Sequence, residues 1–214
     1  MKKQISKIIM IVAIGFTIVA CKDKAKEANT TEAEAAAVAT SASDKYVANA
    51  EESTIEWKGF KPTGTHTGTI GIESGLFTTK AGSIQSGTFL IDMTSIVNTD
   101  MPAENEGNAK LVGHLKSADF FDVEKFPSAA FEITGLKDNM LSGNLTIKGT
   151  KNNVSFPVTV SNEGDMMTLA SEAFTIDRSK WNVKYGSKSF FDNLGDKFIN
   201  DDIELKITIK AKKS

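Results

Sequence analysis

Apolar and polar residues alternate with a period of two through most of the chain beyond Tyr46. Such alternation predicts β-strands that bury one face. The last run is the clearest, because one of its faces is wholly aliphatic and consists of Ile203, Leu205, Ile207 and Ile209. Comparable runs lie at residues 54–60, 66–72, 83–93, 129–135, 141–148, 154–160 and 167–176. About eight short strands separated by turn signals predict one mostly β domain over residues 46–214, an antiparallel barrel or sandwich.

A helix is predicted inside the strand pattern, over residues 102–115. Pro102 suits the first helical turn, where its missing N–H costs nothing. Leu111 and Leu115 are four residues apart, so a helix would place both on one face. We therefore expect one short helix to interrupt the strands.

The connection before the last strand, residues 185–202, is too apolar for a plain surface loop. Within it, Phe190, Leu194 and Phe198 are spaced four apart, so a short helix would bring them to one face. We expect this second helix to close the mouth of the barrel as a lid.

The first twenty residues have the order of a secretory signal peptide, with a basic start and an apolar run from Ile8 to Val19. The run is too short to span a bilayer, which takes roughly 20 residues. Residues 18–21 resemble a lipobox, and Cys21 is the only cysteine. We expect residues 1–20 to be cleaved and Cys21 to be lipidated, which would anchor the protein to a membrane of the bacterial cell envelope. The alternatives are an ordinary signal peptide with an incidental cysteine and a short uncleaved anchor.

Residues 22–44 contain no aromatic residue and only Val38 as a large aliphatic one. Such a stretch buries too little surface to fold alone, so residues 21–45 are predicted to be a lipidated cysteine with a flexible tether. A coil of this length would hold the domain roughly 25–30 Å from the membrane. Cleavage after residue 20 would remove three lysines and no acidic residue, which changes the net charge from −2 to −5. This acidic balance argues against nucleic acid as a partner.

Four motifs, in order along the domain, resemble the YceI family. The most specific is H-x-x-S-x-D-F-F-D-x-x-x-F-P-x-x-x-F, which residues 114–131 match. The family's G-x-L-T-I-x-G hairpin, its F-x-I-D-R-S segment and its final strand resemble residues 143–160, 174–181 and 202–209. The resemblance covers essentially the whole domain.

The resemblance implies both a fold and a ligand. The fold is a lipocalin-like antiparallel β-barrel of about eight strands, closed at one end by helix, with one or two short helices in all. The ligand is a polyisoprenoid, an isoprenoid quinone or another long-chain amphiphile held in the barrel. The motif positions that we expect to have structural roles are His114, Ser117, Asp119, Phe120, Phe121 and Arg178.

The composition is compatible with a dry interior, because the chain has 13 Phe against 2 Tyr and 2 Trp. Phe carries no polar atom that needs a partner, so a Phe-lined interior can receive hydrocarbon. Strand glycines such as Gly68 and Gly143 would leave space for it or allow sharp bends. The residues that we expect to contact ligand lie on buried strand faces or in the lid, and they are Trp57, Phe89, Phe131, Leu145, Phe156, Leu205, Phe190 and Phe198. The alternative is that these rings fill a solid core.

The polar motif residues have structural interpretations. His114 is expected at a helix end, where a donor or cation meets free carbonyl groups. Ser117 would cap the turn at residues 119–121, whose two Phe rings would anchor the helix on the barrel. Arg178 is the only arginine among 25 basic residues, so its planar fork could hold a carboxylate bidentately. The alternative is an exposed arginine without a special role.

The sequence offers little chemistry for catalysis. The two histidines are His66 and His114, whereas a zinc site needs about four ligands. There is no G-x-S-x-G elbow and no H-E-x-x-H motif. We expect a non-enzymatic binding protein with no metal or cofactor apart from a bound polyisoprenoid or quinone. The rivals are an interaction module built on a solid barrel and an enzyme on the same scaffold, and a dimer is left open.

Overall fold

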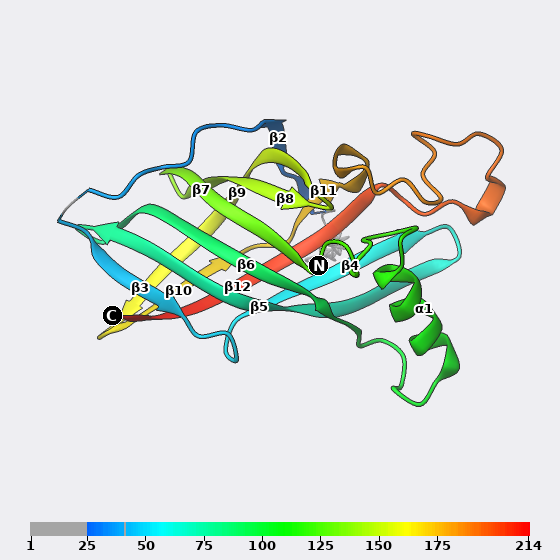
Figure 1. Cartoon of the computed structure of the whole chain (residues 1–214), viewed down its shortest axis with the longest axis horizontal. Helices are drawn as coiled ribbons and strands as arrows, with labels where there is room; N and C mark the ends of the chain where they lie inside the picture. Colours follow the sequence, from blue (N-terminus) through cyan, green and yellow to red (C-terminus); the bar gives the residue numbers. More distant parts are fainter. Residues whose placement is uncertain (1–24, 41) are drawn as a thin grey trace, which may run out of the picture.

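The structure is a computed structural model that describes residues 25–40 and 42–214 (Figure 1). The predicted signal peptide and Cys21 lie outside these residues. The described strands belong to one sheet. They are β1 (Lys26–Glu27), β2 (Asn29–Glu32), β3 (Asp44–Ala48), β4 (Thr54–Lys61), β5 (Gly64–Lys80), β6 (Ser83–Asn98), β7 (Ser128–Lys137), β8 (Met140–Ile147), β9 (Thr150–Glu163), β10 (Met166–Ser171), β11 (Phe174–Asp177) and β12 (Asp202–Lys213).

The sheet closes on itself. Consecutive strands from β4 to β10 pair antiparallel, and β12 then joins β10 to β4. β12 pairs with β10 and β11 along one edge and with β3 and β4 along the other. Each of these couples occupies one place in the ring, which therefore has eight strands. The predicted antiparallel, mostly β architecture is confirmed.

Alternation along the strands places the core inside the ring. On β9, Val154, Phe156 and Val158 are 1%, 3% and 4% exposed and point inward together. Pro157 lies on the other face, between the residues of β9 that pair with β2 and those that pair with β10. Because proline cannot donate to a ladder, this interruption is where it costs least.

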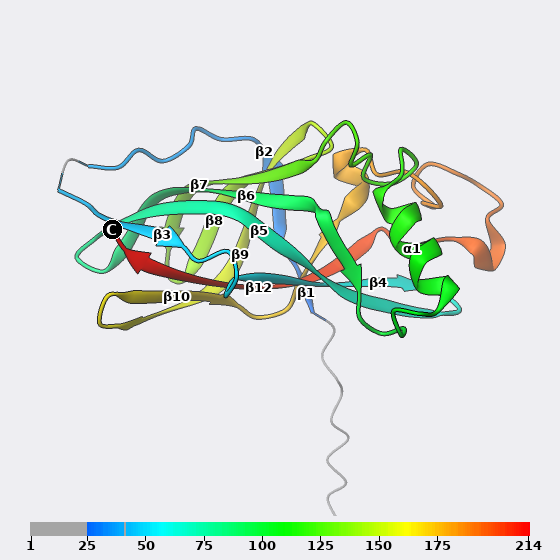
Figure 2. The same cartoon turned by 60° about the horizontal axis from the view of Figure 1, so that its bottom comes forward.

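One end of the ring is covered by α1 (Glu106–Lys116) and by the segment between β11 and β12 (Figures 1 and 2). The helix begins four residues later than predicted. Pro102 precedes it, and Asn105 is the N-cap, whose side chain accepts a backbone N–H of the first turn. The Asn105 side chain can accept an N–H of the first helical turn, whereas the proline side chain has no acceptor. This difference explains why the helix begins after Asn105 rather than at Pro102. No helix in the described part of the chain is long and apolar enough to cross a membrane.

The covering segment begins with the 3₁₀ turn η1 (Arg178–Trp181) and continues as residues 182–201, the mouth loop. The predicted lid helix over residues 190–198 is wrong. Its only regular part is a second 3₁₀ turn, η2 (Gly195–Lys197). Asn193 and Gly195 have φ values of 60° and 54°, which the interior of an α-helix does not accept.

The segment predicted as a flexible tether is largely built into the wall, and we call residues 26–37 the N-terminal strap. β1 lies parallel to β11, and β2 lies antiparallel to β9. Ala28 between them is buried and donates its N–H to the carbonyl of Thr175 at 2.8 Å. The strap therefore bridges β9 and β11.

The strap is held by hydrogen bonds rather than by apolar burial. The side-chain amide of Asn144 accepts the N–H of Glu34 at 2.9 Å and donates to its carbonyl at 2.7 Å, as a strand neighbour would. Ala37 donates its N–H to the carbonyl of Ile133 at 2.9 Å. Apolar content could not reveal this, because the strand edges supply the partners through main-chain groups.

Replacing Asn144 with Ala should release the strap. The substitution removes both bonds to Glu34 and should lower the free energy of unfolding by about 1–3 kcal/mol. Hydrogen exchange over residues 29–37 should rise more than exchange in β12. Asn162→Ala, on an exposed part of β9, is the control and should change neither quantity. Equal exchange at the strap in both variants would contradict its attachment through Asn144.

Candidate ligand-binding cavity

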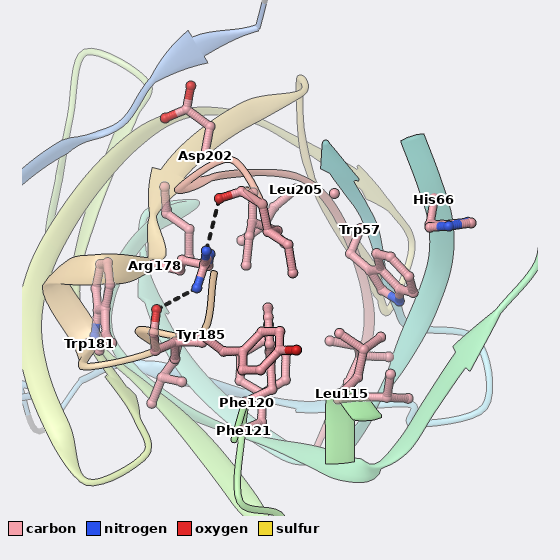
Figure 3. Close-up of a pocket in the computed structure, with 18 of the residues that line it drawn as sticks. Trp57, His66, Leu115, Phe120, Phe121, Arg178, Trp181, Tyr185, Asp202 and Leu205 are labelled. Carbon is pink, nitrogen blue, oxygen red and sulfur yellow. Dashed lines mark hydrogen bonds between the residues drawn. The ribbon is translucent and has the colours of Figure 1, made fainter. Parts of the chain in front are cut away.

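A cavity of about 340 Å³ opens at the end of the barrel that α1 and the mouth loop cover. Its lining is largely apolar and includes Trp57, Leu115, Phe120, Leu145, Trp181 and Leu205. Figure 3 looks into it and shows His66 and Asp202 at the edge, with their polar atoms directed away from the centre. The predicted ligand residues Trp57, Leu145 and Leu205 line this cavity.

Trp57 sits against a glycine that makes room for its ring. It is paired with Gly68 on β5, and a Cβ at position 68 would lie 2.6 Å from the indole and 1.9 Å from the carbonyl oxygen of Val97. Gly143 likewise adjoins the Phe131 ring, at 2.3 Å from a hypothetical Cβ. The expectation that these glycines leave space for ligand is therefore corrected, since aromatic rings occupy that space.

Three predicted ligand residues, Phe89, Phe131 and Phe156, lie deeper and line a separate space of only about 40 Å³. The Phe131 and Phe156 rings are 5.8 Å apart, and Phe156 stacks on Phe174 at 4.3 Å. These rings fill the barrel as core side chains do. They form the floor of the cavity rather than its walls.

Arg178 organises the mouth loop. Its guanidinium, 1% exposed, donates to the carbonyls of Asn200, Val183 and Ile199 at 3.1, 2.6 and 3.0 Å. It also lies 3.3 Å from a carboxylate oxygen of Asp201. Burial lowers the pKa of Arg178 below its usual range, and the charge of Asp201 opposes that shift. The predicted bidentate carboxylate grip is therefore replaced by a fork that holds three backbone carbonyls.

The guanidinium also packs 5.2 Å from the centroid of Phe120, which connects the mouth loop to the turn after α1. His114, in the last turn of α1 as predicted, meets Tyr185 of the mouth loop edge-on at 4.4 Å between centroids. Ser117 is the C-cap of the helix, and its hydroxyl donates to the His114 carbonyl at 2.8 Å. Helix and loop thus touch across the opening through His114 and Tyr185.

The carboxylate of Asp100 holds the segment that connects β6 to α1. Asp100 accepts the backbone N–H of Thr67 at 2.7 Å and lies 3.0 Å from Nδ1 of His66, and it also accepts the Asn98 amide. Desolvation by burial would raise the pKa of Asp100, but hydrogen bonds from Thr67, His66 and Asn98 outweigh it and hold that pKa below its ordinary value. Asp100 therefore ties the end of β6 to β5 beside the opening.

Of the remaining predicted residues, only Phe121 lines the cavity, beside Phe120. Asp119 is exposed in the turn after α1. Phe190 and Phe198 belong to neither space. They point elsewhere because the helix that would have aligned them does not form.

The lining residues that the sequence did not reveal include Trp181 and Tyr185. Trp181 is fully buried, and its indole N–H donates to the carbonyl of Leu145 at 2.8 Å. Its place directly after the F-x-I-D-R-S segment was an available signal. Tyr185 gave no such signal, because its position depends on how Arg178 folds the loop.

Two ring nitrogens in the cavity lining, Nε1 of Trp57 and Nε2 of His114, are buried without a hydrogen-bond partner among the described residues.

Residues 25–40 and 42–214 contain no group of three or more His, Cys, Asp or Glu side chains placed to hold a metal ion.

The fold and the cavity define a class of small β-barrels that enclose an apolar space. Residues 46–211 match the YceI-like domain, and the chain belongs to that family. Two UPF0312 proteins of Staphylococcus aureus, from strains bovine RF122 / ET3-1 and N315, are each 28% identical over 110 residues. That match covers 49% of this chain and 63% of theirs.

Solved structures share the fold. BcnA of Burkholderia cenocepacia aligns with a TM-score of 0.61 and 22% identity over 77% of this chain and 99% of that one. A polyisoprenoid-binding domain of Saccharophagus degradans, implicated in plant cell wall breakdown, aligns with a TM-score of 0.58 and 12% identity. That alignment covers 79% of this chain and 98% of that domain.

Replacing Arg178 with Lys should loosen the mouth loop while keeping a positive charge. An ammonium cannot reproduce the planar fork that holds three carbonyls, so the free energy of unfolding should fall by about 3 kcal/mol or more. Hydrogen exchange should rise over the mouth loop. Lys180→Ala, a partly exposed change in the same 3₁₀ turn, should cost at most about 1 kcal/mol. A melting temperature equal to wild type for Arg178→Lys would refute the proposed role.

Proposed function

We propose that the protein is a non-enzymatic binding protein that holds one long-chain apolar ligand, such as a polyisoprenoid or an isoprenoid quinone. The observation that carries the proposal is the cavity itself, which is largely apolar, lies above the Phe floor and opens at the end of the barrel that α1 and the mouth loop cover. Such a space favours hydrocarbon, because ligand and wall both leave water when they meet. The ligand named for the Saccharophagus degradans domain supports the choice of isoprenoids.

The size of the cavity limits the ligand. A volume of about 340 Å³ is at the lower end of the 300–1,000 Å³ typical of ligand sites. A long chain would therefore keep its far end near the opening unless the floor moved. The buried nitrogens of Trp57 and His114 could pair with a polar atom of the ligand after a small shift of their neighbours, which favours an amphiphile over a pure hydrocarbon.

The proposal includes a place for the protein in the cell envelope, anchored through a lipid on Cys21. Lys26, the first residue of β1, is the fifth residue after Cys21. Five extended residues span at most roughly 18 Å, and the strap begins there. The barrel would therefore lie closer to the membrane than the 25–30 Å that a free tether predicts.

Because a thioether can form only on a thiol, Cys21→Ser should abolish the incorporation of labelled fatty acid and the processing that follows it. Intact mass after expression in a bacterial host measures both. Labelled lipid on the Ser variant would rule out the anchor and would leave the cavity proposal untouched.

Two variants distinguish the role of a wall residue in ligand binding from the role of a floor residue in fold stability. Trp57→Ala should lose most co-purifying lipid, because the ring shapes the cavity, and should melt closer to wild type than a floor variant. Phe131→Ala should lose about 3–5 kcal/mol of fold stability, because it empties the packed floor. The lipid is measured by mass spectrometry of an organic extract. If wild type carries no lipid and Trp57→Ala unfolds as readily as Phe131→Ala, the barrel is solid and the proposal fails.

A further inference from the structure

Exposed aromatic side chains gather on the mouth loop. Tyr185, Phe190 and Phe191 are 47%, 43% and 49% exposed. Figures 1 and 2 show this loop, in orange, projecting past the end of the barrel. The other large apolar side chains exposed in the described residues are spread over the strap end and the barrel wall, at Val38, Val47, Leu76, Val97 and Met140. Exposed apolar side chains that share one projecting loop are a common feature of surfaces that bind a partner or a membrane.

The loop presents these rings from a fixed base. Ser187 is fully buried and donates its hydroxyl to Asp201 at 2.9 Å. Ile199 donates its N–H to the carbonyl of Gly186 at 2.8 Å, and Arg178 holds the carbonyls on either side. Because the base is ordered before any partner arrives, little conformational entropy is lost on docking.

Lysines stand beside the loop's rings. The ammonium of Lys184 lies 4.7 Å from the Phe190 centroid, and that of Lys188 lies 3.6 Å from the Phe198 centroid. At a bilayer surface aromatic rings settle at headgroup depth, while lysine stems extend so that their ammonium groups reach the phosphates. The two Lys–Phe pairs fit that arrangement.

The charge of the mouth loop determines whether electrostatic attraction or burial of the aromatic rings contributes more to docking. The mouth loop carries three lysines, Lys184, Lys188 and Lys197, and three aspartates, Asp192, Asp196 and Asp201. Asp201 lies against Arg178, so Asp192 and Asp196 offset two of the three lysines. Coulomb attraction to anionic lipid is therefore modest, and burial of the rings should supply most of the affinity. Docking should occur on neutral lipid and increase only moderately on anionic lipid.

We propose that the mouth loop docks onto the surface of a lipid bilayer and that ligand passes between the bilayer and the cavity through this contact. The passage of ligand rests on the proposed function, whereas the docking does not. Tyr185 belongs both to the exposed rings and to the cavity lining, so the docking surface is continuous with the opening. A protein partner seated there would cover the opening and block a ligand that leaves for a membrane.

The test uses the unlipidated chain from residue 22 onward, which contains every described element. It is floated with phosphatidylcholine vesicles, with and without phosphatidylglycerol. Phe190→Ser/Phe191→Ser should lower the vesicle partition coefficient about tenfold or more. The control is Val47→Ser/Leu76→Ser, an exposed pair matched in exposure (45% and 43%) and paired between β3 and β5. It should float as wild type does.

A second measurement detects contact with the bilayer directly, without a variant that loses vesicle binding. A Phe190→Trp reporter should shift its fluorescence to the blue on vesicle addition and should be quenched by brominated lipid. Failure of the wild type to float on either vesicle, equal loss in both double variants, or a solvent-exposed reporter would overturn the docking. If the protein does not float but its organic extract contains lipid, the proposed function stands and the docking fails. If the protein floats but carries no bound lipid, the docking stands and the proposed function fails.

Discussion

Strand β12 carries the closure of the barrel, because it pairs with β10 and β11 along one edge and with β3 and β4 along the other. The contacts with β3 and β4 join the last segment of the chain to strands more than a hundred residues earlier. Without them the sheet would have two open edges, and its inward residues would meet water. The cavity exists only because this ring is complete, since the ring excludes water from an interior that side chains do not fill.

Two layers of aromatic side chains bound the cavity, and one arginine orders the loop at its opening. The floor of Phe side chains lies below the cavity, and the rings of Trp57 and Trp181 line the wall above it. Arg178 then folds the mouth loop by holding three of its carbonyls, while Phe120 beneath it ties that loop to the turn after α1. The opening is therefore framed by a helix end and an ordered loop rather than by a second helix.

Most of the barrel could be predicted because burial with a period of two is a local property of strands such as residues 203–209. The wall residue Trp57 was predicted for the same reason. The separation of wall from floor was not, since the contacts of Trp57 with Gly68 and of Phe131 with Gly143 depend on strand register. The strap and the mouth loop escaped prediction because their main-chain groups are held by strand edges and by the side chains of Asn144 and Arg178, and such bonds leave no periodic pattern of apolar residues.

A crystal structure of the chain purified without organic solvent tests the existence of a ligand site most directly. The cavity should contain continuous elongated density that runs from the floor at Phe131, past Trp57 and Leu205, to the opening beside Tyr185. An interior in which these side chains meet and leave no room for such density would contradict the binding of an apolar ligand.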